Sequence, residues 1–374
     1  MARIHLTDRK LFWIRGVDVL VFLDRILTQS VAFAPGQQGP GSQARGGEKQ
    51  EAVFRDPDAI AAEISVGPDP QIKRPVLRTQ CRYGALLTPQ GRLLGDLFVV
   101  RPGEGADQGG SSDPGILLDI SSVFADALIA DMLRYRLRAK IEIVPAPECR
   151  VSWTDEDCGA GCVLDPRPSM GWRDYVVGLA ARTDISEDQA RHDALISSDA
   201  NPDEVPGPIA WWSKPAHDVV QNRFTAPGLS DYHRMRIGSG IVDPAYDSRM
   251  GADFVSDLNL DLVHAMDYHK GCFIGQEVAS RMKRKSEVKR RALRVRLSEP
   301  PRFPLVYGAD LVADGQLLGT IRQGIGREGI AVIRLDRLED ALANRQSIRI
   351  ASSGMPDLDC EVAALPSFDE ERLT

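Results

Sequence analysis

The chain has 374 residues, of which 43% are hydrophobic and 26% charged, and its formal net charge is −7. A single domain usually has about 100–200 residues, so this length predicts two or three domains. The composition is that of a globular protein, and its negative charge argues against attraction of the whole surface to nucleic acid or to an anionic membrane. No apolar run approaches the roughly 18–20 residues of a membrane-spanning helix. We therefore expect no membrane partner, and any anion site has to be a local basic patch.

The N-terminal residues lack a long apolar stretch followed by a small-residue cleavage site, which is the pattern of a secretory signal. We therefore expect a cytoplasmic location, in which the six cysteines are reduced thiols. The only close pair, Cys158 and Cys162, lies in a Gly-rich stretch without a second pair of ligands nearby. A structural metal site needs about four ligands, so no metal is predicted.

The first predicted elements are a strand at 11–18 and a helix at 19–27, which Asp18 could cap. Residues 31–76 are predicted to be a flexible insertion, since much of this segment is rich in Gly, Gln and Pro. A hairpin follows, and its two strands flank the turn sequence Thr-Pro-Gln-Gly at 88–91. The predicted elements from the hairpin to residue 154 are strands at 81–87, 92–100, 115–120, 141–144 and 151–154, and a helix at 124–138.

The C-terminal part of the chain contains a predicted helix at 231–237 and then several short strands broken by glycine. These strands are expected at 292–297, 311–313, 317–321, 329–335 and 347–350. Several short strands at such close spacing are typical of a small β-barrel. The whole pattern predicts an α+β protein with a C-terminal barrel.

One segment, Lys270–Glu277, combines a thiol, a cation and two glycines within eight residues. The glycines allow tight turns or close approach to a ligand. A cation next to Cys272 would lower the pKa of its thiol and favour the nucleophilic thiolate. A lone cysteine is more often a small buried apolar residue, so both interpretations stay open on spacing alone.

The sequence Lys-Gly-Cys-Phe-Ile-Gly-Gln-Glu at 270–277 resembles the Lys-Gly-Cys-Tyr-x-Gly-Gln-Glu signature of the YgfZ-type folate-binding proteins. Other segments resemble further motifs of this family, and the resemblance covers most of the chain outside 35–75 and the poorly patterned middle. These supporting segments are 22–28, 87–96, 232–238 and 257–262.

The resemblance implies the fold of the glycine-cleavage T-protein, an aminomethyltransferase that binds tetrahydrofolate in a hole between its domains. It divides the chain into two α+β folate-binding parts, 1–150 and 151–286, and a C-terminal β-barrel at 287–374. It also implies a tetrahydrofolate-binding protein that supports the assembly or repair of iron–sulfur clusters, with client or assembly proteins as partners. The implied clients include radical enzymes that modify tRNA.

In this interpretation Cys272 is the functional thiol, Lys270 is its neighbouring cation, and no metal is bound tightly. Arg236 could bind a ligand carboxylate or form a structural ion pair, and Asp96 could be a turn cap or an acceptor for the pterin ring. The residues expected to contact tetrahydrofolate or a one-carbon derivative are Tyr83, Asp96, Arg236, Gly271, Phe273, Gly275, Gln276, Glu277 and Arg281.

Two other functions compete with this one. A folate-dependent one-carbon transferase would use the same scaffold, but T-proteins carry two adjacent acidic residues where this chain has Gly95-Asp96, and they lack the motif cysteine. An RNA-binding accessory of tRNA modification could use the basic run from Arg281 to Arg291. That run is otherwise a solvated face or a site for the glutamate tail of folate, and it lacks aromatic residues for base stacking. We therefore expect an assembly factor rather than a turnover enzyme, and no direct binding of nucleic acid.

Overall fold

The computed structural model describes most of the chain. Residues 32–76 of the predicted insertion, and Cys158 of the close cysteine pair, lie outside the described residues. The described ranges are 3–31, 79–102, 115–157, 162–167, 170–176, 228–284, 288–302, 305, 307–351 and 357–363.

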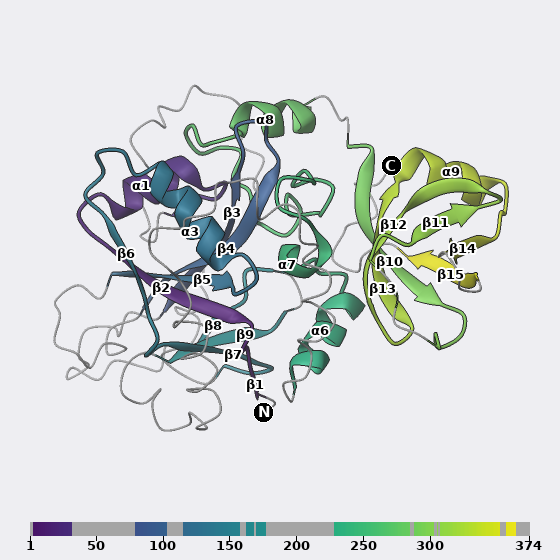
Figure 1. Cartoon of the computed structure of the whole chain (residues 1–374), viewed down its shortest axis with the longest axis horizontal. Coiled ribbons are helices and arrows are strands. Elements are labelled where there is room, and N and C mark those ends of the chain that lie inside the picture. Colours follow the sequence, from purple (N-terminus) through teal and green to yellow (C-terminus); the bar gives the residue numbers. More distant parts are fainter. Residues whose placement is uncertain are drawn as a thin grey trace, which may run out of the picture.

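A five-stranded antiparallel sheet forms the middle layer of the larger part of the molecule (Figure 1). Its strands, in spatial order, are Gln80–Leu87 (β3), Leu93–Arg101 (β4), Ile116–Ser121 (β5), Arg9–Arg15 (β2) and Glu142–Pro145 (β6). Successive side chains of a strand point to opposite faces. In β2, Leu11 and Trp13 enter one core whereas Phe12 and Ile14 enter another. The sheet is therefore buried on both faces, and its strands are almost continuously apolar.

Two helices, Val19–Ile26 (α1) and Ala125–Arg134 (α3), cover one face of this sheet (Figure 1). Apolar side chains at helical spacing, such as Phe22 and Leu128, fill the core between them and the sheet. Asp18 precedes α1 but makes no capping hydrogen bond there, contrary to expectation. Its carboxylate instead accepts the backbone N–H of Lys140 at 2.7 Å and ties the start of α1 to the loop after α3.

A smaller sheet packs on the opposite face, in the order β1-β7-β9-β8. Its strands are Arg3–His5 (β1), Arg150–Thr154 (β7), Trp172–Val176 (β9) and Cys162–Leu164 (β8). The space between the two sheets contains the second core, and it also contains an unusual number of buried charges.

Helices and loops join this sandwich to a closed barrel (Figure 1). The helices before the barrel are Leu229–Gly238 (α6), Pro244–Asp247 (α7) and Gln276–Arg284 (α8). The barrel consists of Arg290–Leu297 (β10), Glu328–Arg334 (β13), Gln316–Ile325 (β12), Asp310–Ala313 (β11), Ile348–Ala351 (β14) and Leu358–Ala363 (β15), with one helix, Leu335–Ala343 (α9). The predicted α+β fold with a C-terminal barrel is confirmed, although α7, α9, β1, β8, β9 and β15 were not predicted. Among the described residues, none of the helices combines the length and apolar character needed to cross a membrane.

Candidate functional site: an anchored thiol loop and a buried acid

The buried side chain of Lys270 anchors the loop that carries Cys272. The Lys270 ammonium donates to the carbonyl oxygens of Leu27 and Gln29 at 2.9 and 3.0 Å, and lies 3.3 Å from the Asp24 carboxylate. Its side chain is only 3% exposed, and this burial lowers its pKa although Asp24 opposes the shift. The role expected for Lys270 is thus changed, because its ammonium binds the loop after α1 and not the thiol.

The second half of the motif packs against the β3–β4 hairpin. Gly275 has a φ of +80°, and a Cβ atom there would lie 2.6 Å from the Thr88 carbonyl oxygen. Gly91, in the hairpin turn, has a φ of +76°, and a Cβ atom there would lie 2.9 Å from the Cβ atom of Val278 in α8. The segments at 22–28, 87–96 and 270–277, which are far apart in sequence, therefore meet at one place. Both glycines are required there by close contact and by backbone conformation.

Cys272 lies at the surface of this anchored loop and is exposed. Its thiol forms no hydrogen bond with any residue that the structure describes, whereas Cys81, Cys149, Cys162 and Cys360 are buried. The neighbouring Phe273 is only 7% exposed and anchors the loop in the core between the sheets. The loop thus presents one thiol to solvent from a fixed backbone, so Cys272 is not a buried core residue.

The basic run that follows is partly neutralised. Arg290 and Arg291 donate to Asp257 and Asp261 at 2.7 and 2.6 Å. Lys283 lies over the ring of Tyr268 at 3.9 Å. Gln276 and the exposed Glu277 begin α8, and Arg281 is exposed on it. The described residues of the run, 281–284 and 288–291, therefore do not form a continuous stripe of free cations of the kind that tracks nucleic acid.

A buried acid, Asp96, lies between the two sheets. Its side chain is enclosed, with 1% exposure, and Tyr83 donates its hydroxyl to Oδ2 at 3.0 Å. Among the described residues the other oxygen, Oδ1, has no hydrogen-bond partner. Burial, together with the negative charge of Asp243, raises the pKa of Asp96 to about 6. Asp96 is consequently no turn cap, but an interior carboxyl group that can hold a proton and has one oxygen available.

Paired arginines and aspartates surround this acid. Asp119 accepts from Arg9 at 2.6 Å and from Arg173 at 2.5 Å. Burial alone would raise the pKa of Asp119, but the two guanidinium groups outweigh it and lower the pKa. Asp165 binds Arg167 through two hydrogen bonds, at 3.0 and 2.8 Å. These acids are fixed as carboxylates by their partners, in contrast to Asp96.

Arg236 is fully buried at the junction of α6, α7 and the barrel. It donates to Asp247 at 2.7 Å, to the Ile241 carbonyl oxygen at 3.0 Å, to His233 at 2.9 Å and to Gln323 of β12. Most donors of Arg236 are thus used inside the protein, and it forms the ion pair with an aspartate that was one of its two predicted roles.

The structure brings most of the predicted residues into two groups. Cys272 and the motif residues form the surface loop, whereas Tyr83 and Asp96 form part of the interior cluster. Sequence reasoning missed several members of this cluster, of which Arg9, Asp119 and Arg173 are the best paired. For Asp119 the signal was a charge inside a strand otherwise made of apolar residues, Ile-Leu-Leu-Asp-Ile at 116–120.

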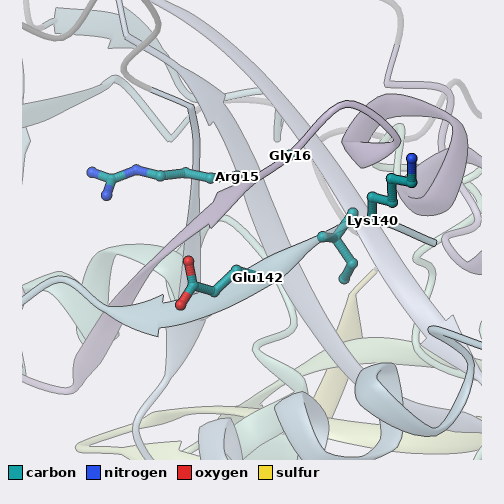
Figure 2. A pocket seen from close by; sticks show the side chains of 5 residues that line it. Arg15, Gly16, Lys140 and Glu142 are labelled. Carbon is teal, nitrogen blue, oxygen red and sulfur yellow. The ribbon is translucent and has the colours of Figure 1, made fainter. Parts of the chain in front are cut away.

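An open recess elsewhere on the molecule is lined by Arg15, Gly16, Lys140, Ile141 and Glu142, and Figure 2 shows its side chains splayed apart. None of the predicted ligand-binding residues lines it. As for metals, the described residues contain no group of three or more His, Cys, Asp or Glu side chains able to hold an ion.

Comparison with known proteins supplies independent findings. A family model described as the CAF17 C-terminal beta-barrel domain matches residues 289–356. The human protein named iron–sulfur cluster assembly factor IBA57, mitochondrial, is 26% identical over 366 residues, covering 92% of this chain and 81% of that protein. Its mouse counterpart is 26% identical over 280 residues, covering 70% of this chain and 66% of that protein. The Mycosarcoma maydis homolog of the same name is 28% identical over 218 residues, covering 56% and 44%.

Among solved structures, the glycine cleavage system aminomethyltransferase T from Bartonella henselae is similar to this chain with a TM-score of 0.56 and 12% sequence identity. The match covers 98% of this chain and 86% of that one, which confirms the expected fold and carries no information on activity.

These relatives also correct one prediction. The cytoplasmic location expected from the N-terminal residues is contradicted, because the similar proteins are named as mitochondrial. The chain is thus similar in sequence to IBA57-type iron–sulfur cluster assembly factors, on a scaffold shared with the glycine-cleavage aminomethyltransferase and with a CAF17-type C-terminal barrel.

Proposed function

We propose that this protein supports the assembly or repair of iron–sulfur clusters through the thiol of Cys272, and that it binds tetrahydrofolate in the interior next to Asp96. The similarity to proteins named as iron–sulfur cluster assembly factors supports the first part. The observation that carries the proposal is the exposed Cys272 on a loop that Lys270 anchors through hydrogen bonds to the carbonyl oxygens of Leu27 and Gln29.

The anchored loop suits a thiol that has to meet a partner. Lys270 and Gly275 fix the backbone on both sides of Cys272 and leave the sulfur open. One thiolate cannot complete the ligand shell of an iron–sulfur cluster, which usually needs four protein ligands. The cluster is therefore a shared substrate, with the remaining ligands supplied by a client or assembly protein.

The interior offers an acceptor to a ligand rich in N–H donors. The Oδ1 atom of Asp96 is buried without a partner among the described residues, and a buried acceptor of this kind is costly unless something donates to it. The N–H groups of a pterin ring would supply such donors. Tetrahydrofolate therefore fits the residues present, and Asp96 would hold and orient its ring.

The position before Asp96 favours a binding factor over a one-carbon transferase. A Cβ atom on Gly95 would lie 2.6 Å from the ring of Phe124, on the face of the sheet covered by α3. A second carboxylate at this position would point away from Asp96 and collide with the helix core. The acidic pair of the transferases thus has no room here.

The proposal is tested by anaerobic reconstitution of an apo [4Fe–4S] enzyme in the presence of this protein, of Cys272→Ser and of His269→Gln. His269 is the matched control, because it is an exposed neighbour outside the proposed site. We expect the wild type and His269→Gln to raise the rate or yield of active enzyme, and Cys272→Ser to have little effect. Equal stimulation by Cys272→Ser would refute the role of the thiol.

A further inference from the structure

Exposed apolar side chains gather at one end of the two helices that cover the central sheet. In the described chain, eight large apolar residues are exposed, and five of them lie within two short segments, 17–21 and 133–137. We define the Leu137 patch as Val17, Leu20, Val21, Leu133 and Leu137 together with the cations Arg136, Arg138 and Lys140. Contiguous exposed apolar groups of this kind usually mark an interaction site.

The two segments of the patch are in contact. The carboxylate of Asp18 accepts the backbone N–H of Lys140 at 2.7 Å. A Cβ atom on Gly16 would lie 2.1 Å from the Lys140 carbonyl oxygen. In Figure 1, α1 and α3 run side by side, and their buried faces share one core. Val17 and the loop after α3 therefore belong to the same surface.

Leu137 lies at the tip of a tight turn, with a backbone conformation that leucine disfavours. The Ala139 N–H donates to the Arg136 carbonyl oxygen at 2.8 Å, and Leu137 lies inside this turn with a φ of +46°. Gly or Asn normally occupies such a position, because other side chains are strained there. The side chain is nevertheless 88% exposed, and that of Val17 is 85% exposed. Neither the backbone nor the core explains an apolar residue at either position.

The cations of the patch are free within the described chain. The side chains of Arg136, Arg138 and Lys140 are exposed and form no ion pair or hydrogen bond with any described residue. The nearby acids are directed elsewhere: Asp18 binds the Lys140 backbone, and Asp131 pairs with Arg134. In Figure 2, Lys140 extends toward α1 whereas the Glu142 carboxylate points the other way. The patch is therefore apolar at its tips and positive around them.

From this arrangement we infer that the Leu137 patch docks peripherally on an anionic lipid bilayer. Apolar tips enter the region between headgroups and acyl chains, while Lys and Arg beside them are attracted by anionic headgroups. The tips protrude from two separate turns, and a fluid bilayer accepts them without a matching groove. Peripheral docking departs from the expectation of no membrane partner, which rested on the net charge of −7 of the whole surface and on the lack of a spanning run; neither opposes a local peripheral patch. This inference is independent of the proposed function.

The test is co-sedimentation of the full-length protein with large unilamellar vesicles. One set contains phosphatidylcholine alone and the other contains about one third phosphatidylglycerol. We expect binding to the anionic vesicles that weakens with salt, and little binding to the neutral ones. Reversal of charge in Arg136→Glu/Arg138→Glu should lower the partition coefficient by at least about tenfold, since one cation near an anionic surface contributes about fivefold.

Leu137→Asn separates binding from folding, because Asn tolerates the positive φ and the variant should be at least as stable as the wild type. It should weaken vesicle binding several-fold. The matched controls are Leu342→Asn and Arg345→Glu, on exposed positions at the end of α9 in the barrel, and these should bind like the wild type. Absence of binding to anionic vesicles at low salt, or binding that all these variants retain, would overturn the inference. In the former case an acidic protein would become the candidate partner.

Discussion

The Cys272 loop and the Asp96 cluster differ in where they place their polar groups. The loop exposes its thiol to solvent, whereas the cluster buries its carboxyl group in the interior. In the loop, the charged Lys270 is buried so that a small thiol can be exposed. In the cluster, Asp119 and Asp165 are paired with arginines, whereas one oxygen of Asp96 has no partner among the described residues, a feature that it shares with the buried acids Asp8 and Asp247. In the proposed function, the surface site thus uses a thiol on a fixed backbone, whereas the interior site uses an incomplete hydrogen-bond network.

This difference predicts that substitutions in the two regions have different effects on stability. Changes to the paired interior charges should affect stability most. Changes to Asp96 should make stability depend less on pH, and changes at the exposed thiol should leave the fold intact.

The largest effect is expected from Arg236→Met. Removing this guanidinium leaves Asp247 buried without its partner, and breaking a buried pair in this way costs about 3–5 kcal/mol. Urea unfolding measures the loss of free energy of unfolding. The control Arg234→Met lies on the same helix, but its pair with Asp231 is exposed and contributes at most about 1 kcal/mol. Similar losses for both variants would contradict the structural role of Arg236.

Asp96→Asn should change the pH dependence of stability. The pKa of Asp96 is raised to about 6 in the folded protein, from 3.8. Its contribution to stability is therefore fully present below about pH 4 and is lost as the pH rises through 6. The lost contribution is on the order of 3 kcal/mol, at about 1.4 kcal/mol per pKa unit. Without ligand, the free energy of unfolding of Asp96→Asn should therefore rise relative to that of the wild type between pH 4 and 7. If the two free energies instead change with pH in parallel, Asp96 is not a buried acid.

A smaller effect is expected from adding one methyl group to the motif loop. Gly275→Ala should cost about 1–2 kcal/mol, because the new Cβ would meet the Thr88 carbonyl oxygen at a φ of +80°. Gly271→Ala is the matched control, since no atom lies within 4 Å of its added Cβ. Its free energy of unfolding should change by no more than about 0.5 kcal/mol. Equal costs would mean that the loop is not held against the hairpin.

The smallest effect on stability is expected at the thiol itself. Cys272→Ser should change the free energy of unfolding by less than about 0.5 kcal/mol, because the side chain is exposed. Folded Cys272→Ser should, however, lack the thiol that reacts rapidly with 5,5′-dithiobis(2-nitrobenzoic acid) in the folded wild type. A fast phase of unchanged amplitude would show that Cys272 is not the accessible thiol.

Much of the architecture could be predicted from the sequence. The hairpin, the strand after it, α3 and most barrel strands follow from local periodicity, and the Lys270–Glu277 motif led to the fold. The short strand β1 and the last strand β15 were not predicted, because each is defined by the strands that it pairs with more than by its own residues. Pairing of distant charges, such as Arg9 with Asp119, depends on which strands become neighbours, and no local pattern encodes that.

The roles of single residues were harder to predict than their positions. Lys270 was expected to activate the thiol next to it, but the backbone turns its ammonium to the loop after α1. Arg236 was a candidate ligand contact, but it is enclosed between the sandwich and the barrel. In both cases the side chain's direction is set by tertiary packing.

The most direct measurement is an anaerobic calorimetric titration of the wild type, Cys272→Ser and Asp96→Asn with tetrahydrofolate. If the surface thiol and the interior acid are separate parts, Cys272→Ser should bind like the wild type. Asp96→Asn should bind at least about tenfold more weakly, because the loss of one charged hydrogen-bond partner costs about 1.5–3 kcal/mol. No binding by the wild type, or binding that depends on Cys272 and not on Asp96, would contradict this division.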